Sequence, residues 1–207
     1  MSKENYALGH LYSLDREGKD RPDKNARLVI LALLTLYKYK AINKIVLTTG
    51  AGLSLQAEKH LRKINPNIPQ EDIIVVNDGL TTRAETRAFA KVVKDKGEIL
   101  YFIYSGPHQE RCERASQKTF GDQKVFSISA EKILRGSFPK PQMMEKALLS
   151  VENSPEYQSL IKHEKVISLV DRIPYLGDIF FVLSDFIPGK VAVQRKIIGM
   201  IEKSHRP

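Results

Sequence analysis

The sequence holds only one cysteine, Cys112, among its 207 residues. A single thiol excludes a disulfide bond within the chain and provides no CxxC or Cys/His spacing for a metal ion. We therefore expect a protein of the reducing cytoplasm that holds no metal. HExxH and GxSxG motifs are absent too, which argues against zinc peptidases and serine hydrolases.

Long apolar runs are also absent. The first ten residues, MSKENYALGH, are too polar for a secretory signal, and the apolar stretch from Leu28 to Tyr37 is too short to cross a bilayer. We expect no transmembrane segment, and we interpret the stretch as part of a buried helix.

The charge is positive but spread out. The formal net charge is +9, yet no run of five consecutive basic residues occurs. Residues 138–207 carry ten basic and eight acidic side chains, so about seven of the nine excess charges lie in residues 1–137. A solvated, lysine-rich surface explains this spread better than a dedicated nucleic-acid face, and an anionic ligand in the first part of the chain fits it as well.

Residues 1–137 alternate between apolar runs typical of buried strands and amphipathic runs typical of helices. This pattern predicts an α/β fold, a Rossmann-like parallel sheet of about five strands with right-handed crossovers and helices on both faces. We expect Gly97 to end the third helix. The expected strands cover residues 6–9, 44–50, 72–76, 98–104 and 124–129, and the expected helices cover 23–40, 53–64, 82–96 and 107–120.

The pattern changes near residue 138, after which only helices are expected. We therefore divide the chain into a Rossmann-like domain, residues 1–137, and a helical appendage, residues 138–207. Its expected helices cover 143–151, 157–170, 176–186 and 191–203. The apolar run IFFVL (179–183) needs a partner, either the chain's own core or a second copy in a homodimer.

Polar residues follow the strand that ends at Tyr104. Pro107 suits a first helical position, which would place His108 in the first turn and Arg111 on the same face. Arg111 could then act as counter-charge to an anion and His108 as a general acid or base, with Ser105 beside them. The alternative is that His108 packs near the helix start and that Arg111 is solvated.

A second polar group follows the preceding strand. Thr82 offers a hydroxyl and Glu85 a carboxylate, which suit a ribose or an amine, with Glu85 as an orienting or catalytic group. The same two residues fit a capping box, in which each side chain pairs with the other's backbone N–H and no ligand is needed.

The loops after the first two strands are further candidates. Glycines in the TTGAG segment (48–52) permit close backbone approach to a phosphate, although the segment is neither GxGxxG nor a P-loop. The candidate ligand-binding residues outside the two groups above are Gly9, His10, Arg21, Thr49, Gly50, Gly52 and Glu58.

In this order and spacing the motifs resemble those of the YdcF/SanA/ElyC-like family, a Rossmann-like domain of unknown function. The resemblance covers roughly residues 5–135. The matching positions are Leu8-Gly9, Arg21, the turn Thr49-Gly50-Ala51-Gly52, Glu58, Thr82 with Glu85, and Ser105 with His108 and Arg111. Ala51 and the pair Gly9-His10 depart from the family pattern. Some relatives bind S-adenosylmethionine, so the resemblance implies a nucleotide-like ligand.

These observations lead to a primary hypothesis and an alternative. The first is a protein that binds a small anionic or nucleotide-like molecule at the carboxyl ends of the strands, where parallel sheets bind ligands. The alternative is a non-enzymatic sensing or interaction module, because no complete catalytic constellation occurs. Nucleic-acid binding is the weaker option. Whether a reaction is catalysed stays open from the sequence.

Overall fold

The computed structural model describes residues 4–11, 22–48, 53–76, 82–94, 97–121, 123, 125–137 and 141–172. The chain divides into two compact units, Met1–Asn153 and Ser154–Pro207. The boundary predicted after residue 137 falls inside the first unit, because helix α6 (Pro141–Glu152) buries Leu148 in the core of that unit.

Five parallel strands form one sheet in the order β3-β2-β1-β4-β5, which confirms the predicted fold class. The strands are β1 (Glu4–His10), β2 (Lys44–Thr48), β3 (Ile73–Val76), β4 (Gly97–Tyr104) and β5 (Val125–Ser129). Successive strands are added on one side of β1 as far as β3, and β4 then pairs with the other side of β1. The point between β1 and β4 is therefore the topological switch point, where open parallel sheets bind ligands.

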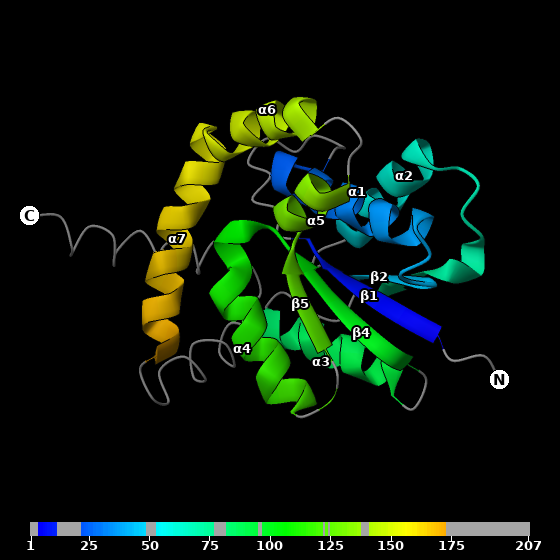
Figure 1. The fold of residues 1–207 in the computed structure, drawn as a ribbon. Helices are drawn as coiled ribbons and strands as arrows, with labels where there is room; N and C mark the ends of the chain where they lie inside the picture. The colour runs from blue at the N-terminus through cyan, green and yellow to red at the C-terminus, as the bar shows by residue number, and fades with distance from the viewer. Residues whose placement is uncertain are drawn as a thin grey trace, which may run out of the picture. The chain divides into compact units, whose positions relative to one another are not determined.

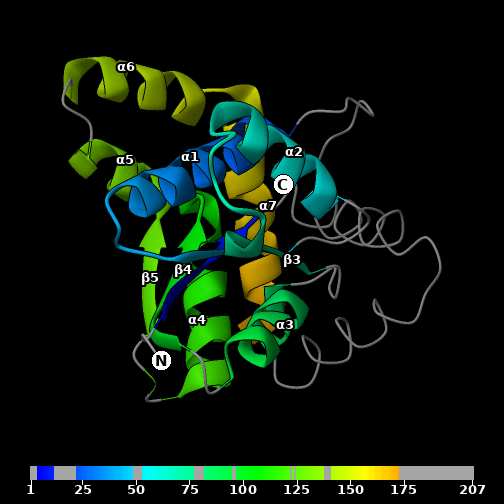
Figure 2. The ribbon, with the colours of Figure 1, turned by 90° about the vertical axis from the view of Figure 1, so that its right-hand side faces the viewer.

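Helices cover both faces of this sheet (Figures 1 and 2). One face carries α1 (Lys24–Lys38), α2 (Leu53–Ile64), α5 (Ala130–Ser137) and α6, and the other carries α3 (Thr82–Val93) and α4 (Gln109–Phe120). Side chains alternate along each strand, so Ala7 and Ile45 join the core under α1 while Leu8 and Val46 join the core under α3 and α4. Apolar residues at successive strand positions fill both cores.

Local sequence explains how α1 begins and how it lies on the sheet. Asp23 caps the helix, as its position before the apolar stretch suggests, and its Oδ1 accepts a hydrogen bond of 2.7 Å from the Ala26 N–H. Farther along, a Cβ at Gly9 would lie 2.6 Å from Leu33 Cδ1. Gly9 therefore lets α1 approach β1 closely.

Several boundaries differ from the sequence-based expectation. Gly97 begins β4 instead of ending α3, which stops at Val93. Residues Gly106–His108 form a 3-10 turn, so His108 lies just before α4 and not in its first turn. Helix α5 was not predicted. In the second unit α7 (Pro155–Arg172) is present, while the helices predicted over 176–186 and 191–203 lie outside the described residues.

No helix in the part of the chain that the structure describes has both the length and the apolar character that a membrane crossing needs.

Candidate functional site

Polar side chains from β1, α3 and the β4–α4 connection meet at the switch point. His10 is the last residue of β1, Thr82 and Glu85 lie in the first turn of α3, and His108 and Arg111 flank the start of α4. We call these five residues the His10 cluster. All five are at most 7% exposed. Such a concentration of buried polar groups is unusual for a protein interior, where polar burial costs free energy.

His10 is held from two sides by α3. Its Nδ1 forms an ion pair with Glu85 Oε2, and its Nε2 lies 3.3 Å from Thr82 Oγ1. Both α3 side chains thus contact His10. Burial alone would lower the pKa of His10, but Cys112 and Glu85 raise this pKa to about 10. His10 is therefore an imidazolium at neutral pH, and its Nε2–H donates to Thr82.

His108 has a different protonation state because it faces a guanidinium. Arg111 Nη2 lies 3.2 Å from His108 Nδ1, and a guanidinium can only donate hydrogen bonds. Nδ1 is therefore the acceptor, so His108 is neutral and carries its proton on Nε2. Its ring stands edge-on to that of His10, with 5.5 Å between the ring centroids. The expected convergence of one imidazole and one guanidinium is present in the structure.

A further buried carboxylate lies beside this cluster and was missed by the sequence reasoning. Both oxygens of Glu131, at the start of α5, accept the Gly106 N–H at 3.0 Å. Glu131 is 3% exposed. The only signal in the sequence was an acidic residue two positions after a strand, which is too common to indicate a site. The Gly106 N–H, the first in the turn before α4, therefore already donates to the Glu131 carboxylate.

Thr48 begins the predicted TTGAG loop but was not among the predicted ligand-binding residues. It pairs with His10 in the register of β1 and β2, so both side chains leave the same face of the sheet. Thr48 is 1% exposed, and its Oγ1 has no hydrogen-bond partner among the described residues. The sequence marked the residues after it, but Thr49, Gly50 and Gly52 lie outside the described residues, as does Arg21.

The other predicted site residues have structural contacts. Gly9 faces Leu33 of α1, on the opposite side of the sheet from His10. Glu58 forms an ion pair of 2.9 Å with Arg62 on α2 and does not belong to the His10 cluster. Ser105 is buried and its carbonyl accepts the His108 N–H at 2.9 Å, which closes the turn before α4. Among the described residues no three His, Cys, Asp or Glu side chains gather where they could hold a metal ion.

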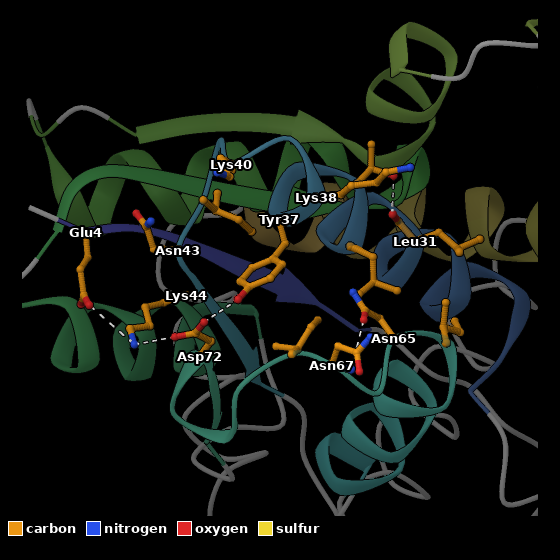
Figure 3. A pocket seen from close by; sticks show the side chains of 15 residues that line it. Glu4, Leu31, Tyr37, Lys38, Lys40, Asn43, Lys44, Asn65, Asn67 and Asp72 are labelled. Atoms are coloured by element: carbon orange, nitrogen blue, oxygen red, sulfur yellow. Dashed lines mark hydrogen bonds and ion pairs between the residues drawn. The ribbon is translucent and has the colours of Figure 1, made fainter.

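A groove of about 800 Å³ lies at the other edge of the sheet, near the amino ends of the strands (Figure 3). Four of its polar residues pair with one another: Lys44 Nζ lies 2.8 Å from Asp72 and 3.6 Å from Glu4, and the Tyr37 hydroxyl donates to Asp72. The hydrogen bond to Asp72, together with burial, raises the pKa of Tyr37 to about 12. Because these groove residues pair with one another and parallel sheets bind ligands at the carboxyl ends of their strands, we assign the candidate site to the His10 cluster.

The chain was compared with protein families, with curated proteins and with solved structures, and none of the three comparisons gives a match. The fold and the cluster define an open parallel α/β protein with a polar site at its switch point. The resemblance to the YdcF/SanA/ElyC-like family continues to depend on the motifs in the sequence alone.

Proposed function

We propose that this chain binds a small anionic or nucleotide-like molecule at the carboxyl ends of β1 and β4. The observation that carries the proposal is the His10 cluster: three segments far apart in the chain bring buried, charged and hydrogen-bonding side chains to the switch point. Sites of this composition, with a strongly shifted pKa, are enriched at functional positions. The YdcF-like motifs support a nucleotide-like ligand such as S-adenosylmethionine.

Each side chain has a role that its chemistry defines. Arg111 supplies a positive charge, and its Nη2 lies 3.2 Å from the neutral imidazole of His108. His108 presents its Nε2–H as a hydrogen-bond donor, and as a neutral imidazole it would polarise an oxygen of the ligand. Glu85 orients His10 and, together with Cys112, raises its pKa.

Calorimetric titration with AMP, S-adenosylmethionine and glucose 6-phosphate tests the proposal. Arg111→Met keeps most of the side-chain volume and removes the charge. Loss of one charge-assisted hydrogen bond costs about 1.5–3 kcal/mol, so we expect binding to weaken roughly 10- to 100-fold. Arg114→Met is the matched control on the same helix, where the guanidinium pairs with Glu110 at 3.7 Å.

Two outcomes contradict the proposal. If Arg111→Met binds as tightly as the wild-type protein, Arg111 is not the counter-charge. If none of the three molecules binds, the site does not recognise this class of ligand. Turnover of a bound molecule that is lost in His108→Asn would assign an enzymatic role, whereas binding without turnover favours the sensing module.

A further inference from the structure

The Thr48 hydroxyl has no structural role that the described residues explain. It is 1% exposed and no described residue pairs with Oγ1. A buried hydroxyl without a partner is unfavourable, and valine would fill the same volume without that cost. Threonines elsewhere in the fold do have partners: Thr35 Oγ1 donates to the Leu31 carbonyl at 2.8 Å. The unpartnered group therefore marks a place where something outside the described structure bonds.

The surroundings of Thr48 define what that partner is. His10 lies beside it in the sheet register and carries a positive charge. Because His10 Nε2–H donates to Thr82 Oγ1, the hydroxyl hydrogen of Thr82 remains available to an acceptor. Thr82 also begins α3, whose backbone dipole is positive at this end. Two hydroxyl donors, a cation and a helix start together favour a negatively charged oxygen.

The start of α4, which follows β4, does not offer the same environment. The Gly106 N–H before α4 already bonds both oxygens of Glu131. A second anion there would face the charge of this buried carboxylate. The two helix starts therefore differ in charge, and only the start of α3 combines donors with a cation and an unpartnered hydroxyl.

We propose that Thr48 and Thr82 bind a phosphate or carboxylate oxygen of the ligand at the start of α3, next to His10. This inference rests on the proposed function and adds to it a position for the anionic group and Thr48 as a further binding residue. Phosphate and carboxylate groups share an anionic oxygen that accepts hydrogen bonds from hydroxyls.

Thr48→Val tests this proposal, with Thr35→Val as the matched control. Thermal unfolding is followed for each protein in inorganic phosphate, in acetate and in chloride at equal ionic strength. We expect Thr48→Val to be at least as stable as the wild-type protein in chloride, whereas Thr35→Val loses stability. We also expect phosphate or acetate to raise the Tm of the wild-type protein and of Thr35→Val but not that of Thr48→Val. The anion that raises the Tm shows whether the site takes a phosphate or a carboxylate group.

Three results overturn the proposal. The first is a loss of stability in Thr48→Val like that in Thr35→Val, which would mean that the hydroxyl has a structural partner. The second is an unchanged anion effect in Thr48→Val, and the third is no effect of either anion on the wild-type protein. If Arg111→Met weakens calorimetric binding while Thr48→Val does not, this placement fails and the proposed function stands. If neither variant weakens binding, both fail.

Discussion

Replacing Glu85 with glutamine removes the carboxylate that faces His10 and leaves the shape of the side chain. The two side chains are 2% and 6% exposed, so His10 is left in the protein interior without the carboxylate that faces it. Breaking a buried pair in this way costs about 3–5 kcal/mol. We expect a loss of this size in the free energy of unfolding, measured by urea denaturation near pH 7.

The pH dependence gives the same prediction a second and sharper readout. The pKa of His10 is raised from 6.5 to about 10 in the folded protein, so folding takes up a proton between these values. Its contribution to stability is complete below pH 6.5 and is lost as the pH rises to 10, with a slope of up to about 1.4 kcal/mol per pH unit. In Glu85→Gln this slope should become smaller, since only one of the two groups that raise the pKa of His10, Cys112, remains.

Glu110→Gln is the control for this experiment. Glu110 pairs with Arg114 at 3.7 Å on the surface of α4, where an ion pair contributes about 0–1 kcal/mol. If Glu85→Gln is as stable as Glu110→Gln, or if its stability falls with pH in parallel with the wild-type protein, the buried pair does not hold His10 in its charged form.

Two further predictions concern the sheet. Gly9→Ala would place a Cβ 2.6 Å from Leu33 Cδ1 and should lower the free energy of unfolding by about 1–3 kcal/mol. Gly136→Ala is the control, because a Cβ there would meet no atom from another part of the fold within 4 Å, and it should be neutral or stabilising. Equal effects of the two substitutions in urea denaturation would refute the packing argument. Burial of Asp72 acts to raise its pKa, but hydrogen bonds from Lys44 and Tyr37 lower this pKa below its usual value. The contribution of the Asp72 carboxylate to stability is therefore present above the usual pKa and is lost as the pH falls. Asp72→Asn should therefore cost about 1.5–3 kcal/mol at pH 7 and much less at pH 3, and a difference that is the same at both pH values would contradict this.

The fold could be predicted because buried parallel strands and amphipathic helices have distinct apolar patterns. The run Ile45–Leu47 is buried on both sides and is continuous in the sequence, as such strands are. Helix α5 has only eight residues, too few for its period to stand out. The end of α3 was misplaced at Gly97 because β4 begins at this residue, close to the end of α3. A glycine at such a boundary fits the end of a helix as well as the start of a strand.

The candidate site could be predicted only in part. The rule that ligands bind at the carboxyl ends of strands located His10, Glu85 and Arg111. The pairing of His10 with α3 could not be predicted, because Thr82 lies 72 positions away and only the sheet order brings it close. Glu131 has no motif, and the unpartnered hydroxyl of Thr48 is a property of packing that no sequence pattern carries.

Nitrogen NMR of the histidine side chains during addition of AMP, S-adenosylmethionine or glucose 6-phosphate tests the central claim most directly. Four histidines lie among the described residues: His10 and His108 at the switch point, His60 on α2 and His163 on α7. The account predicts that a ligand shifts the resonances of His10 and His108 and leaves those of His60 and His163 in place. A molecule that binds by calorimetry without any change at His10 or His108 would contradict it.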